Sequence, residues 1–238
     1  MKQPIIFCDF DGTITKIDNI VSLMKRFAPK EWEQIKDDVL AQNISIREGV
    51  GRMFHLIPSK LKQELLDYLV ATTEIRQGFS EFVDYTRQEG IELYIVSGGI
   101  DFFIYPLLKP YGIPEENIFC NGSDFTTDTI SITWPYACGD DCTKDCGCRK
   151  PGILNRFDKK ANRKIVIGDS ITDLEASKQA DFVFARDFLA EKCQELGIPA
   201  VLFETFDDIV EKLTEERGEE SCAKWRIDGT NLLILKMN

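Results

Sequence analysis

Two aspartates separated by one residue follow the first apolar run of the chain, in the sequence Asp9-Phe10-Asp11-Gly12-Thr13. Residues 4–10 predict a buried strand, and Gly12 permits a sharp turn after it, so both carboxylates can face one cavity. Two acids this close need a cation to neutralise them, and magnesium binds carboxylates together with phosphate oxygens. One acid can then attack phosphorus while the other protonates the leaving oxygen. The pair alone is equally compatible with solvated acids in a loop.

Two further motifs supply groups that suit a phosphate. Val96-Ser97-Gly98-Gly99 follows a β-rich run, and a hydroxyl beside glycine backbone N–H groups can cradle an anion. Arg149-Lys150-Pro151-Gly152 begins a helical pattern, where Lys150 can neutralise both the phosphate and an attacking acid. The ordinary alternatives are a helix N-cap for Ser97 and an exposed lysine for Lys150.

The fourth motif is Gly168-Asp169-Ser170-Ile171-Thr172-Asp173, which follows a buried strand. Asp169 at the strand end can complete a metal shell. Asp173, one helical turn further on, can reach Lys150 or a metal-bound water. Acids are also common at helix N-termini without any such role. The joint occurrence of four motifs in this order is what favours a phosphoryl-transfer site.

The elements that must position these residues alternate between strands and helices. This alternation predicts a parallel sheet covered by helices on both faces, with a ligand site beyond the carboxyl ends of the strands. A possible hairpin spans residues 123–134. The main predicted strands are residues 91–96, 118–120 and 164–167, and the main predicted helices are residues 79–88, 101–109 and 151–157.

A helical segment interrupts this pattern directly after the first strand. Apolar residues recur at helical spacing from residue 18 to about residue 73, with breakers that divide the segment into about four helices. We therefore predict a core domain of residues 1–16 and 76–238 and a helical cap domain of residues 17–75.

The four motifs, DFDGT, VSGG, RKPG and GDSITD, resemble those of the haloacid dehalogenase superfamily of aspartate-nucleophile phosphatases. The match runs from about residue 5 to residue 173. The resemblance implies an α/β fold with a Rossmann-like core, a parallel sheet and an inserted all-helical cap. It also implies a phosphoric monoester hydrolase that depends on Mg²⁺.

The resemblance assigns a role to each motif residue. Asp9 is similar to the nucleophile and a magnesium ligand, and Asp11 to the general acid/base whose backbone carbonyl binds the same ion. Asp169 corresponds to the third metal ligand. The residues that bind the phosphate, called the phosphate grip below, correspond to Ser97, Gly98 and Lys150. The outer-shell acid corresponds to Asp173.

The helical insert and VSGG are similar to the phosphoserine phosphatase branch. A cysteine-rich insertion before RKPG resembles a methionine-salvage branch, which implies a phosphate ester of that pathway as substrate. Phosphoserine and other small phosphorylated metabolites remain alternatives. A non-catalytic phosphate-ligand sensor or a scaffold is an alternative of another class, although a sensor is expected to lose an acid from the first motif.

The formal net charge of -11 and the pI of about 4.7 argue against nucleic acid and anionic membranes as partners. The chain shows neither a signal-peptide pattern nor an apolar run of about 18 residues, so we expect a cytoplasmic protein. Its expected partner is a small phosphorylated metabolite, and a dimer is left open. In the tail, residues 221–238, the run 232–235 reads as an edge strand or an oligomer contact.

A cysteine-rich loop offers a second metal hypothesis, a structural Zn²⁺. Its spacing is not a well-attested zinc pattern, so an exposed insertion is the alternative; its thiols are Cys138, Cys142, Cys146 and Cys148. In the helical segment, four polar residues can contact substrate or serve only as surface or packing residues: Asp18, Arg47, Arg52 and His55.

Overall fold

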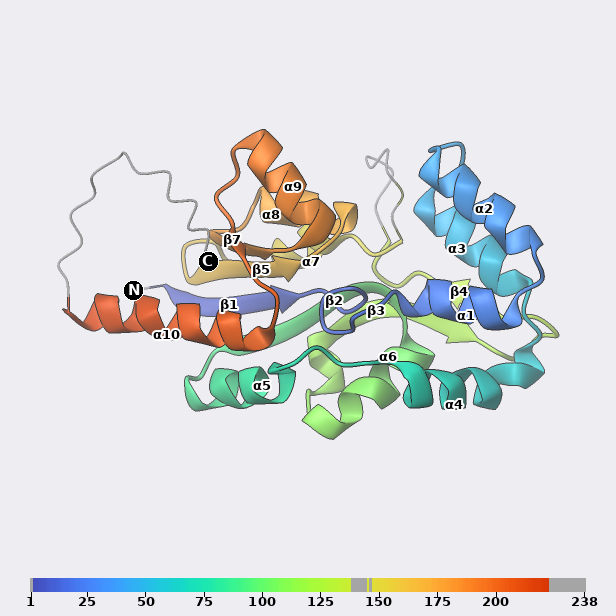
Figure 1. Cartoon of the computed structure of the whole chain (residues 1–238), viewed down its shortest axis with the longest axis horizontal. Coiled ribbons are helices and arrows are strands. Elements are labelled where there is room, and N and C mark those ends of the chain that lie inside the picture. The colour runs from blue at the N-terminus through green and yellow to red at the C-terminus, as the bar shows by residue number, and fades with distance from the viewer. Residues whose placement is uncertain (1, 138–144, 146, 223–238) are drawn as a thin grey trace.

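The computed structural model describes residues 2–137, 145 and 147–222, with side chains to residue 216. Its centre is a seven-stranded sheet in the order β4-β3-β2-β1-β5-β6-β7 (Figure 1). The strands are β1 (Gln3–Cys8), β2 (Glu92–Ile100), β3 (Ile118–Asp124), β4 (Ser131–Thr133), β5 (Asn162–Gly168), β6 (Phe182–Ala185) and β7 (Val201–Leu202). All neighbouring pairs are parallel except β3 and β4, which form the predicted hairpin.

β1 lies between β2 and β5; β1 and β5 end together, whereas β2 continues to Ile100. Cys8 is paired with Ile95 of β2 and with Ile167 of β5. Because the chain crosses to one side of β1 for β2 and to the other side for β5, a crevice forms at their carboxyl ends, where ligands bind in open α/β sheets. The predicted fold class is confirmed.

Helices cover both faces of the sheet, and each face has its own apolar core. On one face, Phe79, Phe82 and Phe206 pack with Ile6 and Cys8 of β1. On the other face, Ile5 and Phe7 of β1 pack with apolar residues of α7 and α8. The covering helices are α5 (Phe79–Gln88), α6 (Asp101–Leu108) and α10 (Phe206–Cys222) on the first face and α7 (Lys150–Leu154), α8 (Leu174–Ser177) and α9 (Asp187–Leu196) on the second (Figure 1).

Four helices are inserted between β1 and α5, as predicted. They are α1 (Asn19–Phe27), α2 (Glu31–Leu40), α3 (Ile46–His55) and α4 (Lys62–Thr72). They lie beyond the end toward which β1 points, at the right of Figure 1. Their buried residues include Leu23, Met24 and Phe54, which are fully enclosed. They belong to the same apolar cluster as Ile6 and Cys8 of β1, so the insert packs continuously against one face of the sheet.

Backbone hydrogen bonds hold the insert to the rest of the chain at two of its connecting segments. Its entry and exit segments pair with each other, through a bridge between Thr15 and Ile75 and a 2.9 Å bond from Lys16 N to Glu74 O. On the far side, the segment between α3 and α4 bonds to the β3–β4 turn: Ser59 N donates to Asp128 O at 2.9 Å. Two separated attachments restrain how the insert can move.

Several element boundaries differ from the predictions. Strand β2 does not end before the Ser97 motif but continues to Ile100, with a register irregularity against β3 between Val96 and Ile100. Helix α7 stops at Leu154, whose carbonyl oxygen accepts a 2.6 Å bond from buried Lys164 Nζ, so the predicted helix over residues 151–157 was too long. The hypothesised tail strand lies outside the described residues. Among the described helices, none has the length and apolarity needed to cross a bilayer.

Candidate active site

Asp9 stands immediately beyond β1 and is nearly buried, at 6% exposure. Its backbone N–H donates to Ile167 O of β5 at 2.9 Å, so the sheet ladder fixes its position. Oδ1 accepts a 2.8 Å bond from the backbone N–H of Phe10, and Oδ2 lies 2.8 Å from Lys150 Nζ. The turn that begins here therefore leaves the carboxylate oriented by two donors.

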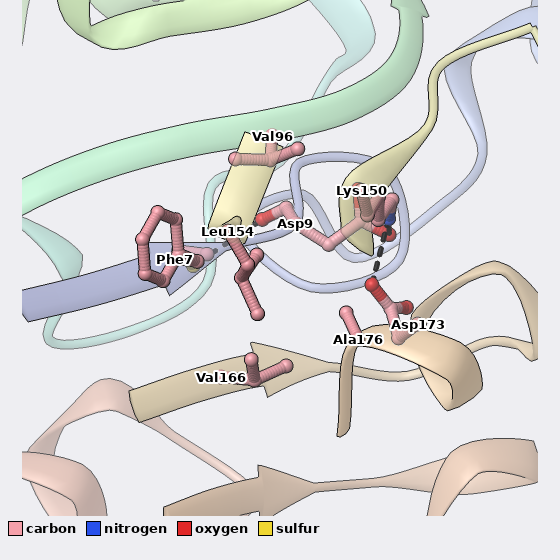
Figure 2. A pocket seen from close by; sticks show the side chains of 9 residues that line it. Phe7, Asp9, Val96, Lys150, Leu154, Val166, Asp173 and Ala176 are labelled. Atoms are coloured by element: carbon pink, nitrogen blue, oxygen red, sulfur yellow. Dashed lines mark hydrogen bonds and ion pairs between the residues drawn. The ribbon is translucent and has the colours of Figure 1, made fainter. Parts of the chain in front are cut away.

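Lys150 is the first residue of α7 and is 3% exposed. Its ammonium group joins Asp9 to Asp173, whose Oδ1 lies 2.7 Å away (Figure 2). Burial alone lowers the pKa of Lys150, but attraction to Asp173 and Asp9 and hydrogen bonds to both outweigh burial and raise that pKa. The lysine is thus a permanently charged group inside the site.

Apolar side chains close the site behind this ion pair. Figure 2 shows Phe7, Val96, Leu154, Val166 and Ala176 around a small cavity beside Asp9 and Lys150. The cavity measures only about 10 Å³, at the lower limit for one water molecule. With little water near them, the charges of the site interact more strongly than they would at the surface.

Asp9, Asp169 and Asp173 form a carboxylate cluster, with one oxygen of each within 4.8 Å of the others. Asp169 accepts a 2.8 Å bond from Thr13 Oγ1, and Asp173 Oδ2 accepts a 3.1 Å bond from Ser170 N. Three carboxylates facing one ammonium leave an excess of negative charge, and carboxylate oxygens are ligands that hard divalent cations prefer. The cluster therefore has the composition of a divalent-cation site.

The pKa values of this cluster record the same excess of negative charge. Burial, and then repulsion by Asp173, raises the pKa of Asp9 well above its usual range despite the opposing attraction of Lys150. The same two causes raise the pKa of Asp169 to about 6. A bound cation would reverse these shifts, because an opposite charge favours the ionised form.

Gly12 is required by the close approach of this cluster. Its φ is +79°, a conformation that side chains disfavour, and a Cβ there would lie 2.3 Å from Asp169 Oδ2. Only glycine allows the turn after β1 to bring Asp11 and Asp169 to the same crevice.

Asp11 is oriented differently from Asp9. Its Oδ1 accepts two bonds from Asn19 at the start of α1, from the backbone N at 3.0 Å and from Nδ2 at 2.6 Å. Burial, and then repulsion by Asp18, raises the pKa of Asp11 to about 7, although the bonds from Asn19 oppose this rise. A carboxyl group with such a pKa can both give and take a proton near neutral pH.

The Ser97 motif lies beside Asp11. Ser97 is fully buried, and its Oγ accepts a 2.9 Å bond from Gly99 N. A Cβ at Gly99 would lie 2.6 Å from Asp11 Oδ2 and 3.2 Å from Ser97 Oγ. Asn121 Nδ2 donates to Gly98 O at 2.7 Å and so fixes the peptide of the motif from β3.

The structure thus brings the predicted motif residues to one edge of the sheet. Sequence reasoning missed Thr13, Asn19 and Asn121, which hold Asp169, Asp11 and Gly98. Thr13 falls inside the first motif, so its position was a usable signal. Asn19 and Asn121 follow no pattern in the sequence and are found only from their contacts.

The residues weighed in the helical segment have partners away from this cluster. Arg47 pairs with Asp145 at 3.4 Å, and Arg52 pairs with Glu48 at 3.4 Å. His55 Nδ1 lies 2.9 Å from Thr129 Oγ1 and is exposed, while Asp18 caps α1 by accepting from Val21 N. Their other interpretation, as surface or packing residues, fits these contacts.

The cysteine loop falls largely outside the described residues, which include none of Cys138, Cys142 and Cys146. Cys148 is described and is buried in the apolar cluster that contains Val96 and Ile153. Among the residues that the structure describes, the cluster of potential metal ligands does not include Cys148.

The sequence matches the haloacid dehalogenase-like hydrolase family over residues 6–178, which is more than half of the chain. The chain belongs to the haloacid dehalogenase-like hydrolase family. The predicted resemblance to this family is therefore confirmed, and the matched range contains the residues of the site described above.

Two relatives within this family are similar over nearly their whole lengths. A protein of Geobacillus kaustophilus (strain HTA426) is 59% identical over 212 residues, which cover 89% of this chain and 96% of that protein. A protein of Brevibacillus brevis (strain 47) is 51% identical over 218 residues, covering 92% and 98%. Both are named 2-hydroxy-3-keto-5-methylthiopentenyl-1-phosphate phosphatase.

Solved structures of the family share the fold. A substrate-bound phosphoserine phosphatase aligns with a TM-score of 0.64 at 16% identity, covering 89% of this chain and 99% of that chain. A phosphoserine phosphohydrolase-like protein from Francisella tularensis aligns with a TM-score of 0.62 at 21% identity, covering 89% and 99%. At these identities the likeness establishes the fold alone.

Proposed function

We propose that this chain is a magnesium-dependent phosphomonoester hydrolase that forms an aspartyl-phosphate on Asp9. The observation that carries the proposal is the buried Lys150 ammonium, 2.8 Å from Asp9 and 2.7 Å from Asp173, beside a cluster of three carboxylates. A nucleophilic carboxylate needs positive charge around it before an anionic phosphate can approach. Lysine and a divalent ion together supply that charge.

Asp9 and Asp169 would hold Mg²⁺ with their carboxylates, and Asp11 with its backbone carbonyl. When bound, the ion neutralises the phosphate oxygens and lowers the repulsion between them and Asp9. Asp173 keeps its contact with Lys150 and the backbone N–H of Ser170, which makes it an outer acid that orients the lysine.

The reaction divides into two transfers. In the first, an Asp9 oxygen bonds to phosphorus, the ester P–O bond breaks, and the leaving oxygen takes a proton from Asp11. In the second, water attacks phosphorus and gives a proton to Asp11, the Asp9–phosphorus bond breaks, and phosphate is released. Lys150, Ser97 and the backbone N–H of Gly98 stabilise the charge on the phosphoryl oxygens.

The protonated oxygen of the general acid would be Asp11 Oδ2. Oδ1 already accepts two bonds from Asn19, whereas Oδ2 faces the Ser97–Gly99 segment that we propose for the phosphate grip. An in-line displacement requires that Asp11 and the nucleophile approach the phosphate from different sides.

We propose 2-hydroxy-3-keto-5-methylthiopentenyl-1-phosphate as the substrate, which would yield the acireductone of methionine salvage. This proposal is supported by the two relatives at 59% and 51% identity, which are both named as phosphatases of this compound. A small phosphorylated metabolite in a metal-neutralised site is also compatible with a chain of net charge -11, because the local cations offset the overall repulsion.

We further propose that residues 17–75 act as a cap domain over this site, with residues 1–16 and 76–238 as the core. The insert lies beyond the carboxyl ends of the strands, and its first helix supplies Asn19 to Asp11. A cap in this place would exclude bulk water and contact the part of the substrate remote from phosphorus.

The test is an assay of phosphate release with Mg²⁺ and with EDTA, for the wild type and for Asp9→Asn. We expect activity with Mg²⁺ only, and loss to background in Asp9→Asn. A panel of phosphate esters, including phosphoserine, then ranks substrates by kcat/KM. Retained activity in Asp9→Asn would refute the aspartyl-phosphate, and a higher kcat/KM for phosphoserine would replace the proposed substrate.

A further inference from the structure

Asn19, the first residue of α1, is fully buried although its side chain is polar. A buried amide is stable only when its donors and acceptor are bonded. Its side chain bonds to residues of the turn after β1 and of the end of α4, namely Asp11, Thr15 and Thr73. These contacts link the general acid to both ends of the helical insert.

The contacts fix the orientation of the amide. Thr73 Oγ1 donates to Asn19 Oδ1 at 2.7 Å, so the amide oxygen faces the end of α4. The amide nitrogen then faces Asp11 Oδ1 at 2.6 Å and Thr15 Oγ1 at 3.3 Å. A flipped amide would set its oxygen against the Asp11 carboxylate, and two acceptors in contact repel each other.

The same contacts make the two oxygens of Asp11 unequal. Oδ1 accepts from the backbone N of Asn19 at 3.0 Å as well as from the amide, and donors on an oxygen disfavour its protonation. The proton therefore belongs on Oδ2. A Cβ added at Gly99 would lie 2.6 Å from Oδ2, so this oxygen faces the segment that contains Ser97.

We propose that Asn19 is a positioning residue for the general acid: it holds Asp11 Oδ1 so that the proton on Oδ2 faces the leaving oxygen of the substrate, and Thr73 sets the orientation of the Asn19 amide. The inference rests on the function proposed above. Asn19 does not react and gives up no atom; the proton moves from Asp11 Oδ2 to the leaving oxygen while the ester P–O bond breaks.

This role predicts an effect that depends on the leaving group. The leaving group of an alkyl ester is an alkoxide, which needs a proton. The leaving group of p-nitrophenyl phosphate is a stable phenolate, which does not. The experiment measures first-turnover rates by rapid mixing with Mg²⁺, using phosphoserine as the alkyl ester and p-nitrophenyl phosphate as the ester with a stable leaving group. The first turnover isolates the step in which the leaving group departs.

We expect Asn19→Leu, which removes the amide while keeping the size, to lower the rate with the alkyl ester by about 10- to 100-fold, within the range of general acid catalysis. The rate with p-nitrophenyl phosphate should fall less than about threefold, and KM should change little, because Asn19 does not contact substrate. Asn19→Asp places an oxygen against Asp11 and should show the same selective loss.

Thr73→Val tests the same inference without removing Asn19. It should give a smaller loss, about fivefold, again confined to the alkyl ester. The matched control is Thr72→Val, whose exposed hydroxyl donates to Tyr68 O within α4 and which should behave as the wild type. Thermal unfolding of each variant checks that it is folded. If Asn19→Leu does not fold, the rates of Thr73→Val test the positioning role on their own.

Equal losses with both esters in Asn19→Leu and Thr73→Val would mean that these residues only hold the insert to the core, and the inference would be wrong. Unchanged rates with both esters would also overturn it. Failure of the underlying function is read separately: Asp9→Asn, assayed in the same way, must be inactive with both esters. If Asp9→Asn is inactive and the leaving-group effect is absent, only the role of Asn19 fails.

Discussion

Removal of the Lys150 ammonium should destabilise the metal-free protein more than removal of any surface charge. In Lys150→Met, the apolar part of the side chain is kept, but Asp9 and Asp173 lose the charge that lies 2.8 Å and 2.7 Å from them. Their side chains are 6% and 2% exposed, so water cannot replace it. Removing one partner of a buried ion pair lowers the free energy of unfolding by about 3–5 kcal/mol. Because Lys150→Met leaves two buried carboxylates without their cation, we expect a value in the upper part of that range.

The loss of stability in Lys150→Met should depend on pH in a defined direction. Without the attraction of Lys150, the folded-state pKa of Asp9, already raised by burial and by Asp173, rises further. A group whose folded pKa exceeds its unfolded value supports folding below the unfolded value, and that support is lost as pH rises through the folded value. The stability gap between wild type and Lys150→Met should therefore widen from pH 5 to pH 8.

Urea denaturation in EDTA at pH 5, 6.5 and 8 measures this effect. Lys178→Met is the matched control, because Lys178 pairs with Glu175 at the surface, where a salt bridge contributes about 0–1 kcal/mol. Saturating Mg²⁺ should narrow the Lys150→Met deficit by supplying another positive charge. A deficit below about 1 kcal/mol at pH 8 in EDTA, or one that shrinks as pH rises, would refute the reasoning.

Three further predictions concern the metal and the general acid. The first-turnover rate on an alkyl phosphate should fall about tenfold per pH unit above pH 7, because Asp11, with a pKa of about 7, must be protonated to donate; a rate unchanged between pH 6 and pH 8.5, measured by rapid quench, would contradict this. Thr13→Val removes the hydroxyl on Asp169 and should weaken Mg²⁺ binding about 10-fold in a titration of activity, whereas no change would mean that Thr13 does not orient Asp169. Gly12→Ala should lower the free energy of unfolding, measured in urea, by at least about 1 kcal/mol and raise the Mg²⁺ concentration needed for activity, because φ is +79° and the new methyl would meet Asp169. No change in stability or in Mg²⁺ requirement would argue against the close approach of Gly12 to Asp169.

The sequence was sufficient for the parts of the site that depend on strand ends. Asp9 and Asp169 follow apolar runs that became neighbouring parallel strands, so their convergence followed from the fold class alone. The extent of β2 was not predictable, because Ser97, Gly98 and Gly99 are typical of a turn, yet the chain stays extended to Ile100. Glycine patterns indicate freedom of the backbone and do not say which conformation tertiary contacts select.

Contacts between distant segments were equally beyond the sequence. Asn19 and Thr73 are 54 residues apart, and their bond depends on how the first and last helices of the insert return to the same point of the core. Neither residue belongs to a periodic pattern or a motif. Arg47 illustrates the converse, because its charge and place on α3 suited an anionic ligand until the structure placed it 3.4 Å from Asp145.

The arrangement of the charges indicates why metal binding and folding should be linked in this protein. Three carboxylates with one ammonium are unfavourable in an apolar enclosure, and the raised pKa values of Asp9 and Asp169 express that cost. A core selected for stability alone would hold apolar residues here, since these commonly equal or exceed a buried ion pair in stability. The ion that we propose for catalysis would lower the same cost when it binds. Mg²⁺ at 100 times its dissociation constant should add about 2.7 kcal/mol to the stability of the wild type, and less when Asp169 is replaced by Asn.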